Sequence, residues 1–192
     1  MTNLLILGAG GNIAGKVIDL LSGDPNIRMN LFVRNERKLR NHNSASNRVI
    51  VGDVRDLNAL RQALNGIEIV YANLAGELEQ MAENIVKAMQ EKKVKRLIFI
   101  SSIGIYDEPI RPVLRPYRRA ADVIEASGLE YTILRPTWFT DTDEVDYELT
   151  RKGEPEKGSV ISQKSLASFI AKVIKAPETH VRENLGINKP NS

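Results

Sequence analysis

A cluster of glycines directly follows a short apolar run near the start of the chain. The run Leu4–Leu7 leads into Gly8-Ala9-Gly10-Gly11, and a helical pattern begins at Asn12 and Ile13. Glycines in such a turn let the backbone come close to a ligand, and the free N–H groups at the start of the following helix attract anions. These residues therefore predict a site for a pyrophosphate or another phosphate group.

The spacing of the glycines separates three interpretations of this turn. The strict dinucleotide pattern G-x-G-x-x-G fails because Ile13 stands at its last position, whereas the looser G-x-x-G-x-x-[GA] fits Gly8, Gly11 and Ala14. Residues 10–16 also read G-x-x-x-x-G-K, but a P-loop needs Ser or Thr next, and Val17 has no hydroxyl for Mg²⁺. The pattern favours a dinucleotide site over a P-loop or a purely structural turn.

Two cations follow the second apolar run, about 20 residues past the turn, where a site for NAD usually carries a carboxylate. Arg34 stands at that position, and Lys38 lies one helical turn later. A carboxylate would repel a 2′-phosphate, whereas a guanidinium can bind one through two parallel hydrogen bonds. A solvated basic loop is the alternative. Joined to the glycine turn, the pair predicts NADP(H) as the cofactor.

The elements that would position these residues alternate regularly as far as Pro136. Short apolar runs without polar alternation are typical of strands covered on both faces, and they are Leu4–Leu7, Met29–Val33, Arg48–Val51, Glu68–Ala72, Arg96–Ile100 and Tyr131–Leu134. Helical patterns lie between these runs, at Asn12–Leu21, Asp56–Leu64, Leu78–Lys92 and Pro116–Ser127. The alternation predicts an α/β fold with a doubly wound parallel sheet and helices on both faces.

The remainder of the chain, residues 137–192, has a different texture. Thr140–Glu148 is acidic, which leaves open whether it is a lid or a plain connection, and Arg151–Gly158 is rich in charge, Gly and Pro. A helix is expected over Gln163–Ala176 and a last strand near Asn184–Ile187. This extension is too short for a separate substrate domain. We therefore expect residues 1–192 to form one domain, with the extension covering a cleft at the carboxyl ends of the strands.

Composition excludes several classes of protein. The 192 residues include no cysteine and two histidines, so thiolate chemistry, cysteine-based zinc sites and a histidine-rich metal centre are not expected. The net charge of +3 comes with no nucleic-acid-binding motif, and no apolar stretch approaches the ~18 residues of a membrane span. The start Met-Thr-Asn has no basic n-region of a signal peptide. The expected location is the cytoplasm, and the expected partner is a small molecule.

The chain resembles the atypical short-chain dehydrogenase/reductases, in the NmrA-like and NAD(P)H-binding group that includes flavin and biliverdin-IXβ reductases. The resemblance spans nearly the whole chain and implies a Rossmann-type fold. It rests on an ordered set of motifs: the Gly8–Ala14 turn, Arg34 with Lys38, Val-Gly-Asp-Val at 51–54, Ala-Asn-Leu-Ala-Gly at 72–76, Ile-Ser-Ser at 100–102 and the segment 127–136.

The resemblance implies roles at the adenine and pyrophosphate end of a cofactor. Asp53 and Val54 would flank the adenine. Ala72, Asn73 and Leu74 would run beside the ribose and the pyrophosphate. Asp53 has a structural alternative, because an Asp at this position can cap the turn before the next helix.

The resemblance also implies roles at the nicotinamide end. Ser101 would end the fifth strand beneath the nicotinamide, and Pro136, Thr137 and Trp138 would contact its carboxamide side. Trp138 and Phe139 have an alternative place in the core beneath the acidic segment.

The catalytic pair of typical short-chain dehydrogenases is missing. Those enzymes place Tyr and Lys four residues apart, so that the lysine lowers the pKa of the phenol. The residues four positions after Tyr71, Tyr106, Tyr117, Tyr131 and Tyr147 are Ala, Ile, Ala, Arg and Arg. Tyr117 is the nearest substitute, with a role in anchoring its helix as the alternative. Ser102 could bond a substrate carbonyl or simply end a strand.

Two classes of function follow. In the first, the protein is an NADPH-dependent reductase of a flavin, quinone or similar conjugated acceptor, which tolerates the lack of a strong protein acid. In the second, it binds NADP(H) without turnover and reports the redox state to a protein partner, as NmrA-like regulators do. The short extension leaves little room for a partner platform and favours the reductase.

Overall fold

The computed structural model describes residues 1–42 and 47–192. The order of elements follows the predicted alternation up to Pro136: β1 (Thr2–Leu7), α1 (Asn12–Leu21), β2 (Ile27–Val33), the 3₁₀ helix η1 (Glu36–His42), β3 (Arg48–Val51), α2 (Leu57–Ala63), β4 (Ile69–Ala72), α3 (Leu78–Lys92), β5 (Arg96–Ile100), the 3₁₀ helix η2 (Pro112–Leu114), α4 (Arg115–Ala126) and β6 (Glu130–Pro136). The extension adds β7 (Trp138–Thr140), β8 (Glu148–Arg151), β9 (Val160–Ser162), α5 (Gln163–Lys175) and β10 (Glu183–Asn188).

One sheet of eight strands forms the centre of the fold, in the order β3-β2-β1-β4-β5-β6-β10-β8. Every neighbouring pair is parallel except β10 and β8. The strand order reverses between β1 and β4, because the chain first builds outward to β3 and then returns to the other side of β1. Ligands of open α/β sheets bind at the carboxyl ends of the strands beside such a reversal.

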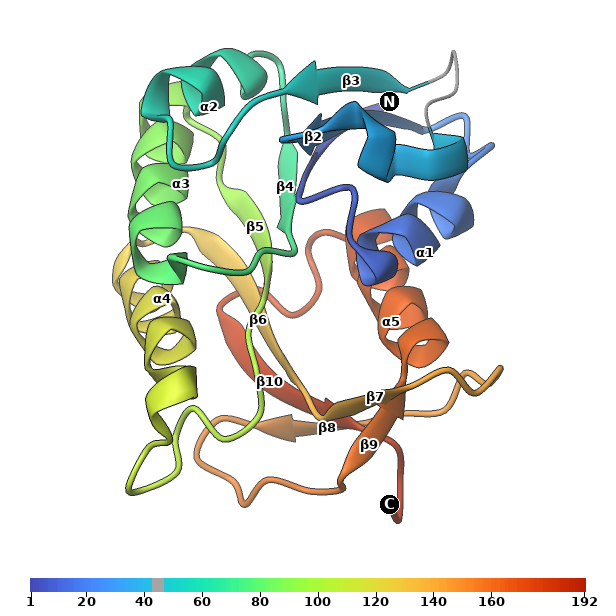
Figure 1. The fold of residues 1–192 in the computed structure, drawn as a ribbon, viewed down its shortest axis with the longest axis vertical. Coiled ribbons are helices and arrows are strands. Elements are labelled where there is room, and N and C mark those ends of the chain that lie inside the picture. The colour runs from blue at the N-terminus through green and yellow to red at the C-terminus, as the bar shows by residue number, and fades with distance from the viewer. Residues whose placement is uncertain (43–46) are drawn as a thin grey trace.

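Helices cover both faces of this sheet, which confirms the predicted α/β fold. Figure 1 shows α1 and α5 on one side and α2, α3 and α4 on the other. Neighbouring strand residues divide between the two layers: Leu4 and Ile6 pack with α1 and α5, whereas Leu5 and Leu7 pack with the other helices. Both faces of the central strands are therefore buried, and this explains why the strands carry no polar alternation.

The extension completes the sheet. β10 pairs with β6, β8 pairs with β10, and α5 packs beside α1 on the same layer (Figure 1). The buried Arg135 of β6 links this strand to the extension. Its Nε donates to Glu156, between β8 and β9, over 2.7 Å, and its Nη1 donates to Asn184 of β10. The short strands β7, β8 and β9 were not expected from the sequence.

The acidic segment after β7 is tied to its surroundings at several points. Asp141 accepts a hydrogen bond from Gln163 over 2.8 Å, and Asp143 pairs with Lys164 over 2.6 Å. Further along, Glu144 pairs with Lys189 over 2.8 Å. These contacts link the segment to α5 and to the end of the chain. None of the described helices has both the length and the apolar character needed to cross a membrane.

Candidate functional site

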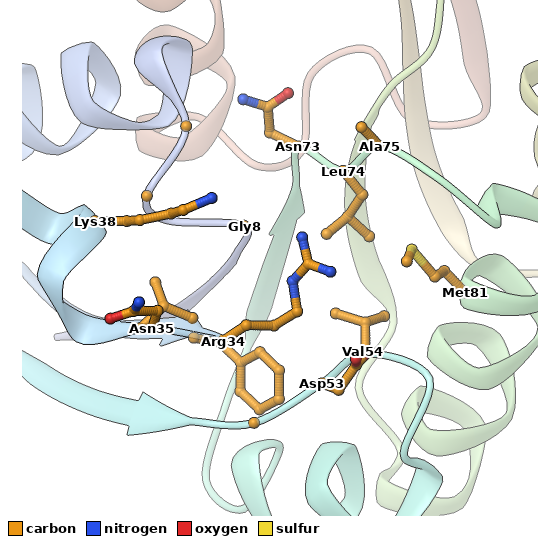
Figure 2. A pocket seen from close by; sticks show the side chains of 15 residues that line it. Gly8, Arg34, Asn35, Lys38, Asp53, Val54, Asn73, Leu74, Ala75 and Met81 are labelled. Carbon is orange, nitrogen blue, oxygen red and sulfur yellow. The ribbon is translucent and has the colours of Figure 1, made fainter.

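A cavity of about 610 Å³ opens at the point where the strand order reverses. Its volume lies within the range typical of small-molecule sites. The carboxyl ends of β1, β2, β3 and β4 all contribute to its wall, as Figure 2 shows. The residues that line it are Gly8, Gly10, Gly11, Phe32, Val33, Arg34, Asn35, Lys38, Gly52, Asp53, Val54, Asn73, Leu74, Ala75 and Met81.

The glycine turn forms one wall of the cavity. Gly8 has a φ of 79°, and a β-carbon there would overlap the carbonyl oxygen of Asn73. The N–H of Gly11 donates to the carbonyl oxygen of Gly8 over 3.0 Å, which closes the turn. Helix α1 then begins with no side-chain cap and no acidic residue in its first turn. Its first N–H groups therefore remain available to a phosphate, and the turn fits a pyrophosphate.

Val17 stands where a P-loop would carry the Ser or Thr that binds Mg²⁺. Val17 is completely buried in the apolar layer under α1. Its side chain therefore faces the core. Among the residues that the structure describes, no group of His, Asp and Glu side chains could hold a metal ion.

Two cations enter the cavity from the side of β2 and η1. Arg34 directly follows β2, Lys38 lies on η1, and both side chains point into the space shown in Figure 2. The N–H of Lys38 donates to the carbonyl oxygen of Asn35 over 3.1 Å, and this bond helps to form the 3₁₀ turn that carries the lysine. The sequence predicted both cations at the same site, and the structure brings them together.

Asp53 lies near these cations, but its charge is largely matched by Arg55. Arg55 Nη2 lies 2.8 Å from Asp53 Oδ2, and the backbone N–H of Arg55 donates to Asp53 Oδ1 over 2.9 Å. These two hydrogen bonds, with smaller contributions from the charges of Arg55 and Arg34, lower the pKa of Asp53 to about 2. Asp53 therefore caps the turn before α2, which was its structural alternative, and it also lines the cavity.

Apolar side chains form the opposite wall, where a flat base could lie. Val54, Leu74 and Met81 face the cavity from the end of β3, the end of β4 and helix α3 (Figure 2). Gly52 makes room for Phe32, because a β-carbon on Gly52 would come within 2.6 Å of the phenyl ring. This wall suits an adenine ring through apolar contact.

Ser101 and Thr137 place two buried hydroxyls at the carboxyl ends of β5 and β6. Each residue is about 95% buried, and neither hydroxyl has a hydrogen-bond partner within the described chain. Buried polar groups are normally paired, so each hydroxyl has capacity for a ligand or a water molecule. Neither residue lines the cavity that contains the glycine turn, so their contact with a nicotinamide stays a prediction.

Exposure distinguishes the two interpretations of the aromatic pair after β6. Trp138 is 75% exposed and Phe139 is 48% exposed, so neither lies in the core. The prediction that this pair lies in the core is wrong.

Two further predicted residues, Pro136 and Ser102, contact the backbone of Ile103. Pro136 ends β6, and its carbonyl oxygen accepts a hydrogen bond from the N–H of Ile103 over 3.1 Å. Ser102 donates its hydroxyl hydrogen to the carbonyl oxygen of Ile103 over 3.1 Å.

Some predicted residues lie beside the cavity without lining it. Ala72 is fully buried in β4, and Ile13 is buried beneath the turn, so only their backbones could approach a cofactor. Asn12 faces a neighbouring polar hollow on the other side of the turn. The residues that sequence reasoning missed are Phe32, Val33, Asn35, Gly52, Ala75 and Met81. Gly52 and Ala75 belong to the motifs at 51–54 and 72–76, whereas Met81 stands on α3, seven residues after Leu74.

The tyrosines form no Tyr–Lys pair among the residues that line this cavity. Tyr117 is partly buried against the apolar layer of α3 and α4, as a residue anchoring the helix start would be. Lys172 donates to the hydroxyl of Tyr147 over 2.8 Å, but both residues belong to the extension and lie outside the cavity lining. Lys152 lies 4.7 Å from the ring centre of Tyr106. Burial, followed by the charge of Glu125, raises the pKa of Tyr106, the opposite of what activates a phenol.

The chain matches the sequence profile of the NAD(P)H-binding family over residues 8–177. This chain belongs to the NAD(P)H-binding family. The match begins at the first glycine of the turn and continues past the end of α5, so it includes every residue that lines the cavity. It confirms the resemblance to the atypical short-chain dehydrogenase/reductases.

Solved structures agree with this assignment. A Rossmann-fold NAD(P)-binding family protein from Shigella flexneri is 50% identical, with a TM-score of 0.93 over 100% of this chain and 95% of that one. A short-chain dehydrogenase/reductase from Veillonella parvula, solved in complex with NADP, is 26% identical, with a TM-score of 0.89 over 99% of this chain and 95% of that one. The family domain therefore has the expected Rossmann-type fold.

A curated relative adds an activity to the comparison. NAD(P)H azoreductase from Xenophilus azovorans is 28% identical over 140 residues, which cover 71% of this chain and 48% of the azoreductase. The chain thus spans about half the length of that relative.

Proposed function

We propose that the protein binds NADP(H) in preference to NAD(H). The presence of Arg34 and Lys38 at the same end of the cavity is the observation that carries this proposal. Asp53, the one carboxylate in the described lining, is paired with Arg55, so its repulsion of a 2′-phosphate is reduced. A 2′-phosphate would therefore meet two cations and a matched acid, and charge-assisted hydrogen bonds are the stronger class.

The other parts of the cofactor have candidate partners inside the cavity and beyond its lining. The turn from Gly8 to Gly11 and the start of α1 would hold the pyrophosphate, and the apolar wall with Val54 and Leu74 would hold the adenine. Ser101 and Thr137 would supply hydrogen bonds at the carboxamide end, where their hydroxyls have no partner within the described chain.

We further propose that the protein is a reductase of a conjugated acceptor such as a flavin or a quinone. The nicotinamide, when bound, supplies the hydride. Reduction of a plain ketone also needs a positioned acid, and none of the five tyrosines has a lysine four residues later in the sequence. A conjugated acceptor spreads the incoming charge and can take its proton from water. The azo bond reduced by the similar azoreductase is a conjugated acceptor of the same general kind.

The experiment is NADPH oxidation, followed at the nicotinamide absorbance, with a panel of flavins, quinones and azo dyes. Simple ketones and aldehydes serve as matched acceptors without extended conjugation. Turnover confined to the conjugated group is the expected result. Tight NADPH binding without turnover on any acceptor would overturn the reductase proposal and favour a redox-sensing regulator with a protein partner.

A further inference from the structure

Lys38 approaches the glycine turn closely at Gly10. A β-carbon placed on Gly10 would lie 2.7 Å from the β-carbon of Lys38 and 3.4 Å from its carbonyl oxygen. Non-bonded carbon atoms prefer separations of ~3.5–4.0 Å, so no side chain fits between the turn and η1. Gly10 has no positive φ, which means that its backbone would accept alanine and that space alone requires glycine here.

The 3₁₀ helix η1 has little freedom to move away from this contact. Leu39, the residue after Lys38, is completely buried in the layer under α1. Each ring nitrogen of His42 lies at hydrogen-bonding distance from an acceptor, at 2.9 Å from the carboxylate of Asp19 on α1 and at 3.0 Å from the carbonyl oxygen of Leu39. These contacts hold η1 on α1, so the position of Lys38 depends on how closely η1 approaches the turn.

The same geometry determines what the ammonium group of Lys38 can reach. The stem of Lys38 starts at the surface of the turn and its side chain extends into the cavity that Arg34 enters from β2 (Figure 2). A side chain at position 10 would push the base of Lys38 outward and carry the ammonium group away from Arg34. The turn and the cation pair therefore form one packed unit.

We propose that Gly10 is a positioning residue for the choice of cofactor, acting through Lys38. By leaving no side chain on the turn, it lets Lys38 lie close enough to share the 2′-phosphate with Arg34. This inference rests on the proposed NADP(H) site, and it assigns to Gly10 a role separate from the approach of the pyrophosphate to Gly8 and Gly11.

The test compares G10A, K38M and the double variant G10A/K38M in calorimetric titrations with NADP⁺ and NAD⁺. G10A should reduce the ratio of NADP⁺ to NAD⁺ affinity by about tenfold, the scale of one charge-assisted hydrogen bond. K38M should reduce it similarly. The double variant should show no further loss, because both changes remove the same contact.

A fragment pair gives a second measurement that does not involve the nicotinamide. G10A should weaken 2′,5′-ADP much more than 5′-ADP. K87M is the matched control for K38M, because Lys87 is exposed on α3 and does not line the cavity. The control should keep the wild-type ratio of 2′,5′-ADP affinity to 5′-ADP affinity within about twofold, and thermal unfolding of each variant checks that it is folded.

The outcomes separate this inference from the proposed function. If the wild-type protein does not prefer NADP⁺, the proposed cofactor choice fails and the role of Gly10 fails with it. If K38M removes the preference but G10A keeps it, only the role of Gly10 is overturned. Equal weakening of NADP⁺ and NAD⁺ by G10A also overturns it, because that result assigns Gly10 to the pyrophosphate.

Discussion

Arg55 binds Asp53 through both side chain and backbone at the edge of the candidate cofactor cavity. The two side chains meet at 2.8 Å between Nη2 and Oδ2, and a second approach joins Nε to Oδ1 at 3.2 Å. Glu77 adds a longer contact to Arg55 at 3.4 Å. The carboxylate that lines the cavity thus carries its own counter-ion, and the cations Arg34 and Lys38 remain available to a ligand.

Replacing Arg55 with alanine should expose the charge of Asp53 to the bound cofactor. The pKa of Asp53 should rise from about 2 toward the ordinary value of ~3.9, and NMR titration of the carboxyl group would measure this shift. Because the folded pKa is depressed, the ion pair stabilises the protein above pH ~3.9 and loses that effect as the pH falls through about 2. At pH 7, R55A should weaken NADPH by up to about fivefold and NADH less. An unchanged Asp53 pKa in R55A would contradict this account.

Replacing Arg34 with alanine should reduce the preference for NADPH. A charge-assisted hydrogen bond contributes ~1.5–3 kcal/mol, so the wild-type protein should bind NADPH at least roughly tenfold more tightly than NADH. R34A should narrow this gap mainly by weakening NADPH, as measured by calorimetry. Added salt should narrow it as well, since exposed charges are screened. Equal affinities in the wild-type protein would refute the assignment of the pair.

Replacing Gly11 with valine should abolish cofactor binding and leave the fold intact. Gly11 has a φ of −80°, and a β-carbon there would lie 3.2 Å from the side-chain amide nitrogen of Asn73 and 3.3 Å from the carbonyl oxygen of Gly8. Both contacts need shifts of only a few tenths of an ångström, whereas the branched side chain would fill the space of the pyrophosphate. Gly8→Val is the contrasting variant: its φ of 79° and its overlap with backbone should destabilise the fold itself. Normal NADPH affinity in a folded G11V protein would rule out the site.

The sequence was sufficient for the elements that carry strong local signals. Helix α1 begins at Asn12, as the glycine turn and the apolar spacing predicted, and α3 spans Leu78–Lys92 as expected. Asp56 was expected inside α2 but is its N-cap, with its side chain accepting from the N–H groups of Asn58 and Ala59. Such shifts at helix ends are small and leave the arrangement of the sheet unchanged.

Features that depend on tertiary contacts could not be predicted. The helix η1 carries a charged sequence with one deeply buried apolar residue, Leu39, so no periodic pattern marks it. Strands β7 and β9 are three residues long and pair only with each other. The contact between Gly10 and Lys38 joins residues from separate elements. Trp138 is a large apolar residue that the sequence would place in the core, but the fold leaves it exposed.

Trp138 offers a direct optical test of the nicotinamide end of the site. It is the only tryptophan in the sequence, and 75% of its surface is exposed just after β6. If it contacts the carboxamide side, NADPH should quench its fluorescence in a saturable manner. The fragment 2′,5′-ADP fills the adenine end and lacks the nicotinamide, so it should leave the emission nearly unchanged. Equal responses to the two ligands would remove Trp138 from the site.

The role of Tyr117 decides whether this protein uses a strong acid of its own. A positioned acid is typically worth ~10²–10⁴-fold in rate. Tyr117 is partly buried against the apolar layer, and Ala121 rather than a lysine stands four residues later, so at most it would orient an acceptor. We therefore expect Tyr117→Phe to reduce the steady-state rate with a flavin or quinone by less than ~10-fold.

The acceptor panel gives the matching control for that variant. Simple ketones and aldehydes should be reduced slowly or not at all by the wild-type protein, because they need a proton at the developing alkoxide. Removing the Tyr117 hydroxyl should then leave the ratio between conjugated and simple acceptors unchanged. A loss of ~10³-fold in Y117F would identify the phenol as the acid. Rapid reduction of a plain ketone by the wild-type protein would show that an acid acts from another position.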